Sequence, residues 1–287
     1  MLPRTIAQIA GAREVDMTND SVEIFAIGTE LVSGLILDTN SHWISSEISL
    51  AGGQVRRITS MPDIMDDIQT ELRRAVDRQT RVVITTGGLG PTPDDMTVDA
   101  VAAVAGCGVH TPPEVLEDYA RRRTMTVAEV STPPRIKMGS VPSVASLHLN
   151  PVGWAPCFDV KLGVTTIWSM PGPPREMEGC FTAHIRPVLA QMFASKSARL
   201  RVYINASESE TSPFMQKVMR DCSYAYLKAY VGMSAQGING LPVDIVVRGL
   251  NGADPQALLQ DAHDRFSAAA AEAGRTVALD PTVLQPR

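Results

Sequence analysis

The segment Thr85–Thr97, which reads TTGGLGPTPDDMT, joins two stretches of different periodicity. Residues 81–84 before it form a short β-branched run that predicts a buried strand, and residues 98–105 after it form an Ala- and Val-rich run that predicts a helix. Glycines in such a strand-to-helix turn let the backbone bend tightly and approach a ligand, and amides at a helix N-terminus favour anions such as phosphate. The glycines of this turn are Gly87, Gly88 and Gly90.

Two neighbouring acids in the same segment, Asp94 and Asp95, complicate a simple phosphate site. They would repel a phosphate unless a divalent cation lay between them and the anion. A purely structural interpretation is also open, in which Thr97 caps the helix and the two acids complement its dipole. The combination of a strand end, three glycines, two prolines, two acids and a hydroxyl exceeds what a turn requires, and it favours a ligand site.

Composition bounds the class of protein. A chain of 287 residues with 44% hydrophobic content predicts one large and one small globular domain. The net charge of −5 argues against nucleic acid as a partner. Four scattered cysteines without a CxxC pair predict reduced thiols, and no stretch resembles a signal peptide or a membrane span, so a soluble cytoplasmic protein is expected. Residues 1–20 are expected to be a flexible extension.

The order of the elements around the glycine segment predicts a parallel sheet. Residues 21–28 read as a strand, residues 54–60 as a second strand, and residues 63–78 carry an apolar stripe typical of a helix. Alternating strands and helices form βαβ units, so residues 21–194 are predicted to be a three-layer α/β/α domain with a mostly parallel sheet. Glu30 follows the first strand, where such sheets bind ligands, and is a candidate ligand group.

Two further segments complete the prediction. Residues 171–177 (PGPPREM) follow a strand expected at 164–170, and their prolines make a second stiff strand-to-helix turn that suits a ligand wall. Residues 198–287 are predicted to be a small α+β domain with the order βαββα. No catalytic constellation is visible in that second domain.

Four motifs resemble the amino-terminal part of the CinA family, the competence- and damage-inducible proteins. They are the segments 27–31 (IGTEL), 85–97, 150–153 (NPVG) and 171–177. That part of CinA proteins is similar to the molybdopterin-binding domains of MoaB and MogA, and residues 198–287 more weakly resemble the KH-like domain that follows it. The amidohydrolase domain of longer CinA proteins has no counterpart in this sequence.

The resemblance implies two kinds of function. CinA-like proteins are associated with metal-dependent hydrolysis of a nucleotide pyrophosphate such as ADP-ribose, whereas the MogA branch binds molybdopterin or a nucleotide. Asp94 stands where the MogA branch usually carries Arg, and the acidic pair is the CinA pattern. The family commonly has a small residue at Trp154 and Gly at Cys157. The resemblance also implies a homo-oligomer, a dimer or a trimer.

We therefore expect a pyrophosphatase site in which Asp94 and Asp95, with Glu30, hold Mg²⁺, Mn²⁺ or Co²⁺ at the GGLGPTPDD loop. The alternative is a domain that binds a pterin or nucleotide without hydrolysis. Lys137 matches a basic position of the CinA pattern, where it would meet phosphate charge. The residues expected to bind the substrate are Gly28, Thr29, Asn40, Gly87, Gly88, Gly90, Thr97, Lys137, Asn150, Gly153, Pro171, Gly172, Pro173 and Glu176.

Overall fold

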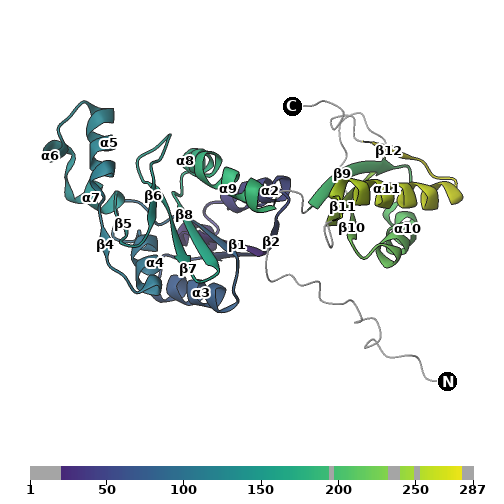
Figure 1. The fold of residues 1–287 in the computed structure, drawn as a ribbon, viewed down its shortest axis with the longest axis horizontal. Helices are drawn as coiled ribbons and strands as arrows, with labels where there is room; N and C mark the ends of the chain where they lie inside the picture. Colours follow the sequence, from purple (N-terminus) through teal and green to yellow (C-terminus); the bar gives the residue numbers. More distant parts are fainter. Residues whose placement is uncertain (1–20, 194–196, 232–239, 249–252, 280–287) are drawn as a thin grey trace, which may run out of the picture. The chain divides into compact units, whose positions relative to one another are not determined.

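A computed structural model describes residues 21–193, 197–231, 240–248 and 253–279 of the chain. The chain divides into two compact units, Met1–Gln191 and Met192–Arg287 (Figure 1). The flexible extension that we predict for residues 1–20 lies outside the described residues. Each unit is therefore treated by itself.

The described part of the first unit contains a six-stranded sheet with the strand order β2-β1-β3-β8-β7-β6. Strands β2, β1, β3 and β8 run parallel, whereas β7 and β6 are antiparallel to their neighbours. The strands are β1 (Ser21–Ile27), β2 (Gln54–Met61), β3 (Val82–Thr86), β6 (Ser146–His148), β7 (Cys157–Leu162) and β8 (Thr165–Met170). The predicted mostly parallel sheet is confirmed, and the antiparallel extension through β7 is additional to it.

Helices cover both faces of this sheet (Figure 1). One face carries α2 (Thr39–Leu50), α8 (Pro174–Cys180), the π-helical turn η2 (Phe181–Ile185) and α9 (Arg186–Phe193). The other face carries α3 (Met65–Asp77) and α4 (Thr97–Ala105). Alternate strand residues point to opposite faces, so Phe25 and Val83 pack against Leu72 of α3 and Val101 of α4 in one buried cluster. The three-layer prediction is confirmed.

The remaining elements of the first unit are short or lie beyond the sheet. After helix α5 (Pro113–Arg123), a Pro- and Ser-rich stretch holds two short helices as well as strand segments. These elements are α1 (Thr29–Val32), β4 (Val109–His110), α5 (Pro113–Arg123), α6 (Val127–Val130), α7 (Pro133–Met138) and β5 (Val141–Pro142).

The described part of the second unit is a four-stranded antiparallel sheet with helices packed on it. The strand order is β10-β11-β9-β12, and a buried cluster that includes Val202, Ile245 and Phe266 lies between the sheet and the helices. Its elements are β9 (Ser197–Ile204), α10 (Glu208–Asp221), β10 (Ala225–Ala229), β11 (Leu241–Arg248), α11 (Pro255–Glu272) and β12 (Val277–Leu279). The predicted βαββα order is confirmed, with β12 as an added edge strand.

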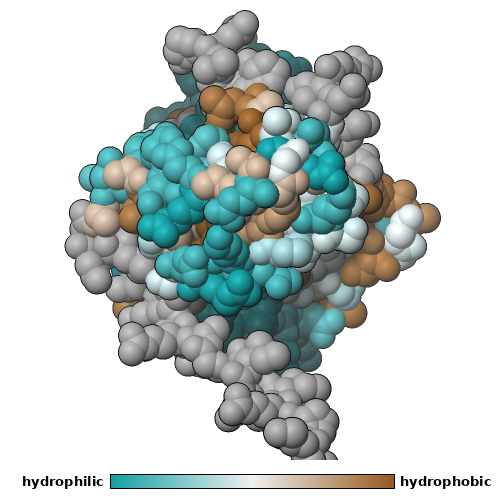
Figure 2. All heavy atoms as spheres, turned by 90° about the vertical axis from the view of Figure 1, so that its right-hand side faces the viewer, coloured by the Kyte–Doolittle hydropathy of each residue, from teal (hydrophilic) through white to brown (hydrophobic). Residues whose placement is uncertain are grey.

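The face of the second unit that Figure 2 shows is mainly polar. Figure 2 looks at its side and shows hydrophilic residues interrupted by smaller hydrophobic areas. Among the described residues, every helix is too short or too polar to cross a lipid bilayer.

The strand order of the first unit leaves a crevice at one edge of its sheet. Strand β1 lies between β2 and β3, and the helices that follow β1 and β3 go to opposite faces, so the chain diverges at their carboxyl ends. In open α/β sheets such a switch point is where ligands bind. A hydrogen bond from Gly28 N to Met61 O (3.0 Å) joins the ends of β1 and β2, and one from Gly87 N to Met170 O (3.1 Å) joins the ends of β3 and β8.

Candidate functional site

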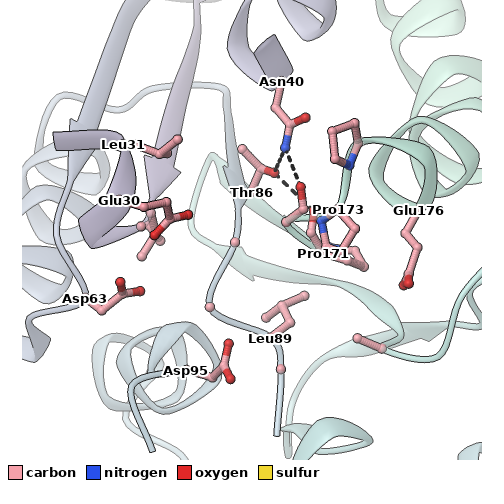
Figure 3. A pocket seen from close by; sticks show the side chains of 18 of the residues that line it. Glu30, Leu31, Asn40, Asp63, Thr86, Leu89, Asp95, Pro171, Pro173 and Glu176 are labelled. Carbon is pink, nitrogen blue, oxygen red and sulfur yellow. Dashed lines mark hydrogen bonds between the residues drawn. The ribbon is translucent and has the colours of Figure 1, made fainter. Parts of the chain in front are cut away.

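A pocket of about 570 Å³ opens at this crevice. Its size falls within the range of small-molecule sites, which is roughly 300–1,000 Å³. The turns that follow β1, β2, β3 and β8 line it, together with the start of α2 and part of the loop before β7 (Figure 3). The pocket therefore lies where the two stiff turns of the sequence meet.

The glycine turn after β3 has a backbone that only glycine adopts easily. Gly87 has a φ of +101°, and a Cβ there would lie 2.1 Å from the carbonyl oxygen of Ile27. Gly88 has a φ of +69°. Thr97 fastens the turn, because its hydroxyl donates to Gly87 O (2.8 Å) and its amide to Gly88 O (3.1 Å).

The structural role that the sequence suggests for Thr97 is therefore wrong. The N-cap of α4 is Met96, and no side chain caps this helix. Thr97 is instead the first helical residue, fully buried, and its hydroxyl points back to the glycine turn. A Ser or Thr before a helix is a capping signal in sequence. Here the glycine turn lies close to the start of α4, so the Thr97 hydroxyl bonds to that turn instead.

The same turn presents backbone donors to the pocket. Gly88, Leu89 and Gly90 line the pocket, and their amide N–H groups donate no hydrogen bond to any residue in the described part of the chain. Leu89 is only 4% exposed, so its amide lies in a largely dry environment. Unpaired amides beside a helix N-terminus are suited to an anion such as a phosphate group.

The two acids of the turn differ in their surroundings. Asp95 is half-buried, and its Oδ2 accepts a hydrogen bond from the amide of Thr92 (2.8 Å) and another from the Thr92 hydroxyl. Asp94 is exposed, and the pKa of its carboxyl lies below the ordinary Asp value because the Thr92 side chain, the Asp94 backbone amide and the charge of Lys137 favour the ionised form. Both acids line the pocket.

Lys137 supports this turn from outside the pocket. Its ammonium group donates to the carbonyl of Thr92 and to the carbonyl of Asp95 (3.0 Å), and it is absent from the pocket lining. In this position Lys137 holds the backbone of the acidic segment. Its side chain contacts the lining residue Asp95 only through that residue's backbone carbonyl and does not itself line the pocket.

A third acid near the glycine turn, Asp63, was not among the predicted site residues. It follows β2, and its Oδ2 accepts hydrogen bonds from the amide (2.7 Å) and the hydroxyl (3.0 Å) of Thr29. Figure 3 shows Glu30, Asp63 and Asp95 on one side of the pocket. The signal that pointed to Glu30, a carboxylate just beyond a parallel strand, applies equally to Asp63.

The proline turn after β8 forms the opposite side of the pocket (Figure 3). Asn40 joins the two turns, because its Nδ2 donates to the hydroxyl of Thr86 (2.9 Å) and to the carbonyl of Gly172 (2.8 Å). The Thr86 hydroxyl donates in turn to Pro171 O (3.1 Å). The Oδ1 of Asn40 is buried and has no partner among the described residues, so this pocket-lining amide retains one acceptor.

The loop before β7 is built on Asn150. Its Oδ1 accepts from the amides of Val152 (2.9 Å) and Gly153 (2.7 Å), and its Nδ2 donates to Glu176 Oε2 (2.8 Å) and to Ala155 O (2.9 Å). Asn150 is thus buried inside the loop and not in the pocket lining. It holds the loop against Glu176.

Most predicted site residues meet at this one pocket, and a few act behind it. Thr29, Thr97, Lys137, Asn150 and Gly153 lie outside the lining and contact residues that belong to it. The predicted residues in the lining are Gly28, Glu30, Asn40, Gly87, Gly88, Gly90, Asp94, Asp95, Pro171, Gly172, Pro173 and Glu176.

The charged side chains that line the pocket are all acidic among the described residues. The lining contains six acids and, among the described residues, neither Lys nor Arg. The acids are Glu30, Asp38, Asp63, Asp94, Asp95 and Glu176. Within the described ranges, no three Asp, Glu, His or Cys side chains are placed so that they alone would hold a metal ion. The described residues thus contain no metal site made of protein ligands alone, although acids and amide donors line the same pocket.

Comparisons with known proteins show which family the chain resembles. A family model described as "Probable molybdopterin binding domain" matches residues 23–191. Protein PAE0875 of Pyrobaculum aerophilum is 33% identical over 248 residues, which cover 85% of this chain and 91% of that protein. A CinA-like protein of Frankia casuarinae is 36% identical over 170 residues, and the match covers 58% of this chain and 39% of that protein.

A solved structure has the same fold. The crystal structure of the protein CinA, with unknown function, from Thermoplasma acidophilum is 30% identical and has a TM-score of 0.55. The match covers 60% of this chain and 99% of that chain.

Proposed function

Because the chain belongs to the family of molybdopterin-binding domains, we propose that its pocket binds a phosphorylated pterin or nucleotide together with a divalent cation. The observation that carries this proposal is that one pocket combines three amides that have no partner among the described residues with charged side chains that, in the same part of the chain, are all acidic. Amides alone favour a phosphate, and the acids alone would reject it. A cation bound between the acids and the phosphate would offset their mutual repulsion.

The acidic side of the pocket fits a cation that arrives with its ligand. Mg²⁺ usually keeps several waters and binds one or two carboxylates plus the phosphates of a substrate, so it does not need a preformed protein cage. Asp94 and Asp95, with Glu30, are the residues that we propose to hold it. The oxygen donors of this set favour Mg²⁺, Mn²⁺ or Co²⁺ over soft metals.

A second candidate function is hydrolysis of a pyrophosphate bond in a ligand such as ADP-ribose. The observation that favours it is the position of the acids next to the amide donors. A cation held there by Asp94 and Asp95, with Glu30, would supply charge neutralisation of phosphoryl oxygens and activation of a water molecule. In this proposal the chain's own residues orient the pyrophosphate, and the half-buried Asp95 keeps the acidic segment in place through Thr92. The homo-oligomer expected from the family resemblance stays a prediction.

Calorimetric titration of the intact chain with ADP-ribose or neopterin monophosphate, with and without Mg²⁺, tests the binding proposal. We expect binding that needs the cation and disappears with EDTA. Asp95→Asn should weaken binding by about tenfold or more, because a charged ligand contact is typically worth about 1.5–3 kcal/mol. The control is Asp99→Asn, which changes an exposed acid of α4 outside this pocket. Equal affinity of the wild type and Asp95→Asn would contradict the proposal.

The two candidate functions separate in a product assay. The chain is incubated with ADP-ribose and Mg²⁺, Mn²⁺ or Co²⁺, and AMP and ribose 5-phosphate are measured. Cation-dependent product that Asp95→Asn removes supports hydrolysis. Tight binding without product supports the binding function alone.

A further inference from the structure

One aromatic residue of the pocket, Trp154, has no role in the proposed phosphate site, although it also packs against the buried cluster that includes Val115 and Tyr119. It lies in the loop between β6 and β7 and belongs to the pocket lining. Its neighbour Gly153 packs so closely on Glu176 that a Cβ at Gly153 would come within 1.8 Å of the Glu176 carboxyl carbon. Glu176 lies on the side of the pocket opposite Glu30, Asp63 and Asp95 (Figure 3). Trp154 is therefore on the side away from these acids.

Helix α5 holds the ring of Trp154 from behind. The ring of Tyr119 meets it edge-on at a centroid distance of 5.5 Å, and the Tyr119 hydroxyl donates to Trp154 O (2.8 Å). The guanidinium of Arg123 lies 4.6 Å from the centre of the indole, a cation–π distance. Arg122 donates to the carbonyls of Gly153 (2.8 Å) and Asn150 (2.5 Å), which fixes the loop itself.

The ring of Trp154 that these residues hold is partly exposed. Of the other two tryptophans of the chain, Trp168 stacks on His148 and is 4% exposed, and Trp43 is half-buried and meets Phe181 edge-on, but neither of them lines the pocket. Trp154 keeps part of its surface open to the pocket, and its indole N–H has no hydrogen-bond partner among the described residues. The guanidinium of Arg122 also lies over the indole, 5.9 Å from its centre. A large aromatic side chain that is held by such neighbours and lines a pocket is pre-organised for a flat ligand.

We propose that Trp154 forms a ring-binding subsite that stacks on a planar heteroaromatic ring of the ligand, an adenine or a pterin. This subsite rests on the proposed binding function and extends it. The phosphates lie at the amides of Gly88, Leu89 and Gly90, and the ring lies at Trp154 on the Glu176 side. One elongated ligand thus uses both ends of the pocket.

The experiment compares ligands with and without the ring. Trp154→Ala, Trp154→Phe and the wild type are titrated with ADP-ribose, neopterin monophosphate and inorganic pyrophosphate in Mg²⁺. Stacking on one base is worth roughly 1–3 kcal/mol, so Trp154→Ala should weaken binding of the ring ligands by about 5- to 150-fold. Its affinity for pyrophosphate should stay unchanged, and Trp154→Phe should restore most of the ring-dependent affinity.

The matched control is Tyr226→Ala, which removes a tyrosine that is 58% exposed in the second unit and should change no affinity. The two probes with rings distinguish adenine from pterin as the preferred partner. If Trp154→Ala weakens all three ligands equally, or none, the subsite is overturned while the phosphate site stands. If the wild type binds none of the three, both the subsite and the proposed function are overturned.

Discussion

The two turns that enclose the pocket are made of opposite chemistry. The turn after β3 is rich in glycine and leaves the amides of Gly88, Leu89 and Gly90 without a partner in the described residues. The turn after β8 contains Pro171, Pro173 and Pro174, which have no N–H group to offer. Both follow neighbouring parallel strands, and Asn40 connects them.

The two turns therefore contribute differently to the pocket: one offers hydrogen-bond donors, and the other forms a rigid wall. The glycine turn can hold an anion through its backbone, whereas the proline turn can only form a stiff wall and start a helix. The proline turn also leads into α8, whose Glu176 meets the loop of Trp154. We expect substitutions in the two turns to have different kinds of effect.

The largest effect should come from filling the glycine turn. Gly87→Ala would place a methyl group 2.1 Å from Ile27 O at a φ of +101°, so we expect a loss of roughly 2–5 kcal/mol in unfolding free energy. Gly172→Ala in the proline turn is the matched control, because its Cβ would make an ordinary contact at 3.5 Å, and a change of about 0.5 kcal/mol or less is expected.

Urea unfolding followed by tryptophan fluorescence measures this comparison, since all three tryptophans lie in the first unit. Equal destabilisation by the two alanines would mean that the two turns tolerate a side chain equally well and would contradict this prediction.

A smaller loss of stability is expected from a substitution at Asn40, which joins the two turns. Asn40→Ala removes two hydrogen bonds and leaves the Thr86 hydroxyl and Gly172 carbonyl with fewer partners, so about 1–3 kcal/mol of stability should be lost. Ligand affinity should fall as well, because the two walls lose their common support. Ser46→Ala is the control, since Ser46 bonds only to the carbonyl of His42 on the exposed side of α2. Unchanged stability in Asn40→Ala would show that the turns are held independently.

The smallest effect concerns pH. The Thr92 side chain is the main cause of the low pKa of Asp94, so Thr92→Val should raise that pKa toward the ordinary Asp value. A lowered pKa keeps the carboxylate ionised as pH falls, so cation-dependent binding in the variant should be lost at a higher pH than in the wild type. Carboxyl carbon NMR titration measures the pKa. A titration curve identical to that of the wild type would contradict this assignment.

Local patterns were enough to predict the framework of the pocket. The β-branched run before Thr85 and the glycines after it lead to β3 and its turn, and Asp38 caps α2 by accepting from the amide of Ser41 (2.9 Å), as a helix-start signal predicts. Such features depend on residues a few positions apart. The sequence therefore shows them directly.

Features that depend on distant contacts were missed. Asp63 looks like the start of the predicted helix 63–78, and its place in the pocket follows from the pairing of β2 with β1. Lys137 was expected to face phosphate, but it bonds to carbonyls 42 and 45 residues earlier in the chain. Strand β7 was left unassigned because it pairs antiparallel with β8, which alternating βαβ units do not anticipate.

The division between backbone and side chain at the pocket bears on how this site can evolve. The donors of the glycine turn belong to the main chain, so most point mutations elsewhere leave them intact. Trp154 is a single side chain on a loop outside the parallel strands. If the proposed subsite exists, one codon change there would alter which ring the pocket accepts, while the main-chain donors for phosphate would stay in place.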